Sequence, residues 1–103
     1  MSAQNATDQE RKKLMIDILE EAMDIVTGNR QKDYGSPENT FEKIASLWSA
    51  YMNQEMQYTA QDVAMMMILL KVGRVPLYGE PTRDTLVDIA GYAAIASYLK
   101  EGA

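Results

Sequence analysis

The sequence predicts an all-α protein that folds as a four-helix bundle in a single domain, residues 1–103. Three observations support this prediction. Four stretches carry apolar residues at the spacing of one helix face. A serine or threonine suited to cap a helix stands before each stretch. Short polar or proline-containing connectors separate the four, and no alternating pattern indicates a strand.

The first helix is predicted to begin after Thr7 and to run to about Thr27. Thr7 and Glu10 have the spacing of a capping box, and Gly28 supplies a stop. We expect residues 1–7 to form a disordered tail. One side of the helix is apolar, with Leu14, Ile18, Ala22 and Ile25. The other side is acidic and typical of a solvated face, with Asp17, Glu20, Glu21 and Asp24.

The second helix is predicted from Ser36 and Pro37, an N-cap followed by a first-turn proline, to about Met52. Its residues at helical spacing predict a buried face made of Phe41, Ile44, Leu47, Trp48 and Tyr51. Its polar face indicates either exposure or a polar cavity and carries Glu38, Glu42, Ser46 and Ser49.

Thr59 and Asp62 predict the start of a third helix, which runs from about Ala60 to Val75. From Val63 to Leu70 this helix is apolar on all sides, so it has to be covered on every side. We therefore expect the third helix to be central, and a second copy of the chain to complete its cover in a homodimer or higher homo-oligomer.

The fourth helix is predicted to begin after Thr82 and to reach Lys100. It follows a loop that contains Pro76, Gly79 and Pro81. With its largely apolar sequence, it is expected to form the centre of the bundle together with the third helix.

Composition narrows the possible functions. The net charge is −5 and the pI is about 4.6, which disfavours a protein that tracks a nucleic-acid backbone. The chain has no cysteine and no histidine, which excludes thiolate catalysis, serine–histidine triads and the usual zinc sites. A metal would be a hard cation such as Mg²⁺ or Mn²⁺. With no signal peptide and no apolar run long enough for a bilayer, we expect a cytoplasmic protein without a membrane partner.

Asp84 and Asp88 are the most informative charged pair. Asp84, Asp88 and Tyr92 fall within about 80° of one another on a helix, on a stripe that is otherwise apolar. A carboxylate directed toward a core requires a partner. The sequence leaves two interpretations open for Asp88, a divalent cation or an ion pair with Lys or Arg, whereas Asp84 also suits a helix N-terminus.

Other charged residues have two interpretations each. Lys71 and Arg74 complement the C-terminal dipole of the third helix, or they bind a polyphosphate. Asp62 is a helix-start acid or a metal ligand, and Glu42 belongs to a solvated face or to a polar site. The connector with Arg30, Lys32 and Tyr34 combines donors with an aromatic ring suited to a nucleotide.

Five short patterns carry a resemblance to known proteins: Arg30-x-Lys32-Asp33-Tyr34-Gly35, Phe41-x-x-Ile44-Ala45-x-x-Trp48, Asp62-x-Ala64, Leu70-Lys71-x-x-Arg74 and Asp84-x-x-x-Asp88-x-x-Gly91-Tyr92. The combined pattern resembles small bacteriophage proteins of unknown function. More distantly, it is similar to the MazG-like all-α nucleoside triphosphate pyrophosphohydrolases. Those enzymes hold Mg²⁺ with Glu-x-x-Glu and Glu-x-x-Asp motifs, and this chain has no Glu-x-x-Glu.

The resemblance implies a Mg²⁺-dependent (or Mn²⁺-dependent) pyrophosphohydrolase that acts on a (deoxy)nucleoside triphosphate in the host cytoplasm. It implies Asp88 and Glu42 as catalytic carboxylates. The metal ligands would come from Glu42, Asp62, Asp84 and Asp88. The substrate would be bound by Lys71, Arg74, Arg30, Lys32, Tyr34 and Tyr92. Two alternatives remain open: a phage protein that sequesters a nucleotide without turnover, for example against host defence, and a structural or regulatory protein that binds a host partner.

Overall fold

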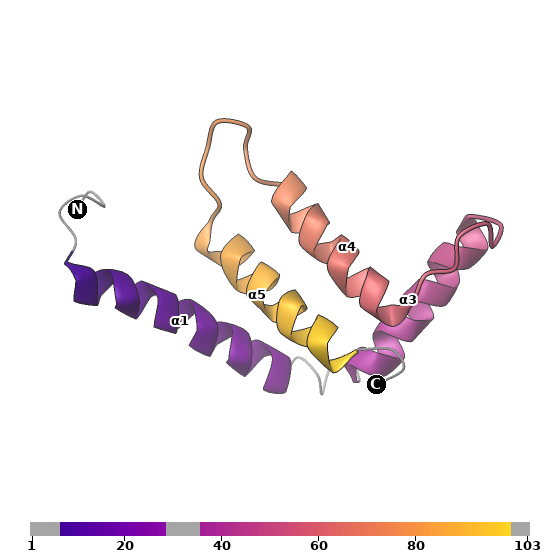
Figure 1. The fold of residues 1–103 in the computed structure, drawn as a ribbon, viewed down its shortest axis with the longest axis horizontal. Coiled ribbons are helices and arrows are strands. Elements are labelled where there is room, and N and C mark those ends of the chain that lie inside the picture. The colour runs from indigo at the N-terminus through magenta and orange to yellow at the C-terminus, as the bar shows by residue number, and fades with distance from the viewer. Residues whose placement is uncertain (1–6, 29–35, 100–103) are drawn as a thin grey trace.

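The structure, a computed structural model, describes residues 7–28 and 36–99 and is all-helical there, with no strand. Four helices follow one another along the chain (Figure 1). They are α1 (Asp8–Thr27), α3 (Pro37–Tyr51), α4 (Ala60–Gly73) and α5 (Arg83–Tyr98). The predicted helical class and the four predicted helices are confirmed. The predicted tail lies almost entirely outside the described residues.

Side-chain caps fix the start of every helix where the sequence predicts it. The hydroxyls of Thr7, Ser36, Thr59 and Thr82 each accept a hydrogen bond from the backbone N–H three residues later. At α4 the capping box is reciprocal, because Asp62 also accepts a hydrogen bond from the Thr59 N–H at 2.9 Å. Local sequence therefore determines where each helix begins.

The helix ends lie close to the predicted ones. The second helix ends at Tyr51, next to the predicted Met52, and α4 ends at Gly73, two residues before the predicted Val75. Pro76 disfavours helical backbone in the residue before it, which accounts for the earlier end of α4. The helix α5 ends at Tyr98 with Leu99 as its cap, and Lys100 lies outside the described residues.

The helices form an open row with α5 between α1 and α4, and α3 packs across α4 (Figure 1). The packing between helices is concentrated in the α4–α5, α1–α5 and α3–α4 pairs. The predicted central position of the third and fourth helices is therefore confirmed. In the described ranges α1 and α3 lie at opposite ends of the row, so the arrangement of the four helices in one chain is open (Figure 1).

The core lies where α3, the beginning of α4 and the end of α5 meet. Val63 and Ala64 are completely buried there. Four of the seven buried residues are alanines, which let the three helix backbones approach one another closely. The seven residues are Phe41, Ala45, Ala60, Val63, Ala64, Ala96 and Leu99, and we call this region the core end.

Part of the predicted buried face of α3 is wrong. Leu47 and Tyr51 are exposed, whereas Trp48 packs at the edge of the core with its ring 6.1 Å from that of Tyr58. The helix packs on α4 through the narrower stripe of Phe41 and residues one and two turns later. With α4 as its main neighbour, α3 buries less of its surface than a helix inside a closed bundle.

Ser49 ends that stripe and is buried, although the sequence places it on the polar face. Its hydroxyl donates to the Ala45 carbonyl at 2.8 Å and accepts from the Tyr58 N–H at 2.9 Å. Asn53 and Gln54 turn the chain with positive φ values of 55° and 62°. The serine therefore fastens the α3–α4 connection back onto α3.

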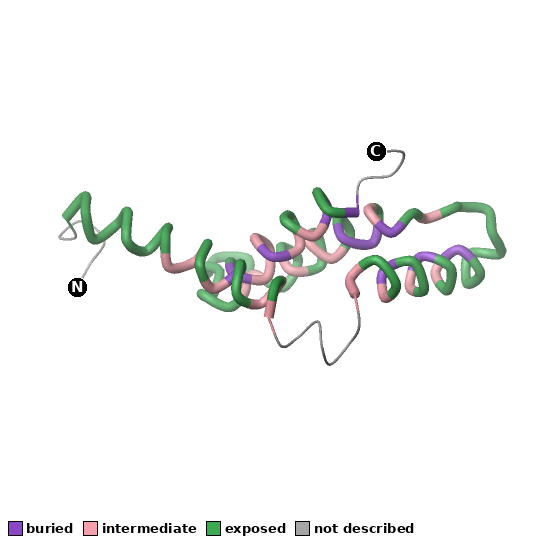
Figure 2. The backbone as a smooth tube through the Cα atoms, turned by 90° about the horizontal axis from the view of Figure 1, so that it is seen from below, coloured by how far each residue is buried: buried purple, intermediate pink, exposed green. Residues whose placement is uncertain are grey.

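The apolar side of α1 is only partly covered. Ala22 is buried, but Leu14 is exposed, because the first half of α1 extends past the beginning of α5 (Figures 1 and 2). The apolar side that the sequence assigns to the first helix is therefore buried at Ala22 and exposed at Leu14 in a single chain. None of the four described helices combines the length and apolar character needed to span a bilayer.

Candidate functional site

An ion pair between Lys71 and Asp88 joins the two central helices. Lys71 lies in the last turn of α4 and Asp88 in the second turn of α5, and these two helices run antiparallel. The Lys71 Nζ is 3.0 Å from the Asp88 Oδ2, and the two side chains are 18% and 27% exposed. This contact is one of the two interpretations that the sequence leaves open for Asp88.

Two further charged side chains lie one turn away on the same helices. Arg74 is the C-cap of α4, and Asp84 lies in the first turn of α5. Both are exposed, and neither makes an ion pair within residues 7–28 and 36–99. We refer to Lys71, Arg74, Asp84 and Asp88 as the charged end of the α4–α5 pair. It has one fixed ion pair flanked by a cation and a carboxylate that are open to solvent.

The structure does not bring the other two predicted metal ligands to this place. Asp62 and Lys71 point to opposite sides of α4, since nine residues on a helix correspond to about 180°. The Asp62 carboxylate is engaged in the capping box with Thr59. Glu42 is exposed on α3. Among the described residues, no three acidic side chains are grouped so that they could hold a metal ion.

The predicted substrate-binding residues divide into three groups. Lys71 and Arg74 belong to the charged end. Tyr92 packs against the core, with its ring centroid 6.2 Å from that of Phe41, and so lies apart from the charged end. The other three, Arg30, Lys32 and Tyr34, lie outside the described residues.

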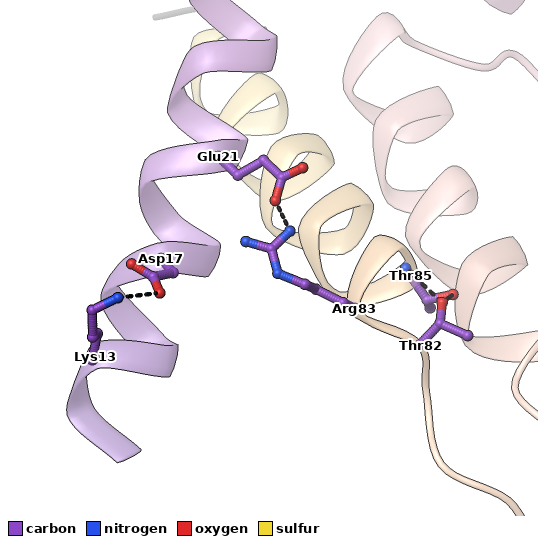
Figure 3. Close-up of polar contacts among 6 residues, drawn as sticks. All are labelled: Lys13, Asp17, Glu21, Thr82, Arg83 and Thr85. Carbon is purple, nitrogen blue, oxygen red and sulfur yellow. Dashed lines mark hydrogen bonds and ion pairs between the residues drawn. The ribbon is translucent and has the colours of Figure 1, made fainter. Parts of the chain in front are cut away.

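A polar contact that the sequence interpretation missed joins α1 to α5. Glu21 forms an ion pair with Arg83, the first residue of α5 (Figure 3). The sequence assigns Glu21 to a solvated face. However, Glu21 lies three residues after Ile18 and four before Ile25, both on the apolar side, and this spacing is the signal that could have identified it.

A separate pocket of about 350 Å³ lies where α1 ends, α3 begins and α5 approaches its end. Its lining is mostly apolar and includes no residue of the charged end. The lining residues are Val26, Thr27, Ser36, Pro37, Ala94, Ile95 and Tyr98. The charged end therefore holds the only predicted site residues that the described structure places together.

Comparison with known proteins gives relatives without an assigned activity. Residues 17–100 match the family described as "Domain of unknown function (DUF6378)". The "Gene 55 protein" of Mycobacterium phage L5 is 47% identical over 78 residues, which cover 76% of this chain and 49% of the relative. The "Gene 55 protein" of Mycobacterium phage D29 is 43% identical over 84 residues, 82% of this chain and 54% of the relative.

The chain thus spans about half the length of these curated relatives. No solved structure matches it. The predicted similarity to bacteriophage proteins is confirmed, and the more distant similarity to MazG-like enzymes stays a prediction.

Proposed function

The chain belongs to the DUF6378 family, and we propose that it is a phage nucleotide-binding protein that takes a (deoxy)nucleoside triphosphate with Mg²⁺ at the charged end. One observation carries this proposal. The half-buried Lys71–Asp88 pair fixes two opposite charges between α4 and α5, and the exposed Arg74 and Asp84 lie one turn away. Cations and carboxylates side by side suit a ligand made of phosphates and a divalent cation.

Each side chain of the charged end has a role in this proposal. The guanidinium of Arg74 presents a planar set of donors to phosphate oxygens, and Lys71 adds a point charge. Asp84 and Asp88 offer carboxylates to the cation, and Mg²⁺ is commonly bound by one or two carboxylates together with substrate phosphates. When bound, Mg²⁺ neutralises phosphate charge, which matters for a chain of net charge −5.

Hydrolysis to release pyrophosphate is the second candidate, and the MazG-like resemblance implies it. The exposed, unpaired Asp84 favours this candidate, because a carboxylate free of Lys71 is available as a base. Asp88 is held by Lys71, and the described residues of one chain supply two acids at the charged end. Binding without turnover therefore agrees best with the geometry of a single chain.

The test is a titration of nucleoside and deoxynucleoside triphosphates, with and without Mg²⁺, by calorimetry, together with an assay for released pyrophosphate. We expect saturable, Mg²⁺-dependent binding of at least one nucleotide. Arg74→Gln and Asp84→Asn should each weaken it about tenfold or more. Lys43→Gln and Asp24→Asn, matched changes at exposed charges on α3 and α1, should leave it unchanged.

Two results would decide against this proposal. Release of pyrophosphate by the unmodified protein, lost in Asp84→Asn, would establish the hydrolase. No binding of any nucleotide would leave the third alternative, a protein that acts on a host partner through its apolar helices.

A further inference from the structure

The outward side of α4 is apolar from Met65 to Val72. Its members are spaced three and four residues apart, opposite the side that packs on α3 and α5. Leu69, near the middle, is 68% exposed. No charged residue occurs between Val63 and Leu70. We call this surface the outer face of α4, and it consists of Met65, Met66, Leu69, Leu70 and Val72.

The chain exposes more surface than a folded monomer of its size. Its accessible surface is 7899 Å², whereas about 5,800 Å² is expected for a compact monomer of this mass. This total covers all 103 residues, so the surface open to a partner is better identified from the described helices, where the outer face of α4 is a continuous exposed apolar area. A standard interface takes roughly 800 Å² from each partner.

We infer that a second copy of this chain packs on the outer face of α4, with the two α4 helices antiparallel about a two-fold axis. An interface between identical copies requires a self-complementary patch, and a continuous apolar stripe fulfils this requirement. Centres of interfaces are depleted in charge and enriched in methionine, as this face is. Flexible methionine side chains adapt to one another across such a contact.

The charge at one end of the stripe determines the direction of packing. Asp62 lies on the outward side of α4 at its beginning, and Gly73 ends the helix. Parallel packing would place two Asp62 carboxylates side by side, where like charges repel. Antiparallel packing about Met66 and Leu69 separates them by most of the helix length. Each Asp62 then approaches Gly73 of the partner, where the structure leaves the space of a Cβ open.

The exposed part of α1 is a weaker candidate for the same role. Leu14 is 64% exposed, close to the value for Leu69. Met15, Leu19 and Met23, four residues apart, are also exposed on this helix. However, charged residues recur through α1 at Lys13, Asp17, Glu20 and Asp24, whereas none occurs between Val63 and Leu70 of α4. Leu69 and Leu14 are thus two leucines of similar exposure, of which Leu69 alone is expected to lie in the interface between copies.

The first experiment measures mass in solution by sedimentation equilibrium and light scattering. We expect the unmodified chain to have about twice its mass of 11.6 kDa. Leu69→Glu should raise the dissociation constant about 100-fold or more, and Leu14→Glu should leave the dimer intact. Circular dichroism on both variants checks that the helices persist. A monomeric unmodified chain at about 100 μM, or a dimer broken only by Leu14→Glu, would overturn the inference.

Crosslinking provides a second measurement that does not depend on a destabilising charge. The chain has no cysteine, so a single introduced thiol marks one position. With a short thiol crosslinker, Met66→Cys should form dimers efficiently because the position lies near the axis. Val72→Cys should do so poorly, because antiparallel packing keeps its two copies far apart. Efficient crosslinking of Val72→Cys would show parallel packing, and no crosslinking at either position would exclude this face.

The dimer is independent of the nucleotide proposal. The Lys71–Asp88 ion pair lies between α4 and α5, on the side of α4 that faces away from Leu69. Leu69→Glu therefore tests association and leaves the charged end in place. A monomeric protein that binds nucleotide would contradict only the dimer. A dimer that binds none would contradict only the proposed function.

Discussion

The two ends of the α4–α5 pair are built in different ways. At the core end, α3 closes over the beginning of α4, and the buried residues are small and apolar. At the charged end α1 reaches the first residue of α5 through the Glu21–Arg83 ion pair, no described helix packs over both α4 and α5, and a half-buried ion pair holds α4 to α5. The loop beyond it exposes Leu77 and Tyr78 almost completely. The difference indicates that apolar packing at one end stabilises the fold, which leaves polar groups at the other end available for a ligand.

The largest expected effect is at the core end. Val63→Asp places a carboxylate at a position with no exposed surface, among the apolar side chains of the core end. We expect this substitution to lower the free energy of unfolding by about 4 kcal/mol, a large part of the total stability of a small domain. Urea denaturation followed by circular dichroism measures this change.

The control is another replacement of an apolar residue by aspartate, made at Leu86 near the charged end of the α4–α5 pair. Leu86 is exposed and lies in the first turns of the helix, where an acid favours the dipole. Leu86→Asp should cost about 1 kcal/mol or less. Equal losses for both variants would show that the two ends contribute equally to stability, against the comparison above.

The second prediction concerns the ion pair itself. Lys71→Met and Asp88→Leu each leave one charge without its partner between two helices. Each variant should lose about 2 kcal/mol of unfolding free energy, less than a fully buried pair would lose because both side chains keep some exposure. The double variant should return to within about 1 kcal/mol of the unmodified chain, since no unpaired charge remains. Urea denaturation of the four proteins gives the coupling energy.

Losses that simply add in the double variant would contradict this prediction. They would mean that the two charges do not stabilise each other. In that case the interpretation of Asp88 as a ligand for a cation would gain support over that of a structural ion pair.

Sequence alone predicts what neighbours along the chain determine. The caps at Thr59 and Thr82 act over three residues, so the starts of α4 and α5 were predictable. The partner of Asp88 was not, because it depends on how the 74–82 loop sets the register between the two helices. Leu47 and Tyr51 were expected to be buried because they are apolar, yet burial also requires a neighbouring helix on that side.

The candidate site shows the same division. The sequence identified Lys71, Arg74, Asp84 and Asp88 as informative, and the fold places them at one end of α4–α5. The sequence alone could not separate Asp62 from these four residues, because helix-start acids and metal ligands are the same residue types. Only the backbone shows that Asp62 points away from Lys71.

The smallest expected effect lies where α1 packs on α5, between the two ends. Gly91 is buried in the middle of α5, and a Cβ added there would lie 3.6 Å from the Cγ1 of Val26, an ordinary packing distance. Because alanine favours a helix more than glycine does, Gly91→Ala should raise the unfolding free energy by about 0.5–1 kcal/mol. Urea denaturation with a fixed slope resolves a change of this size.

The matched control is Gly28→Ala at the end of α1, where a Cβ would collide with the Asp24 carbonyl oxygen, so this variant should lose stability. A loss of stability in Gly91→Ala as well would mean that α1 and α5 are packed too closely to accept one methyl group. The α1–α5 contact would then resemble the core end, and the region of loose packing would be confined to the charged end and the first half of α1.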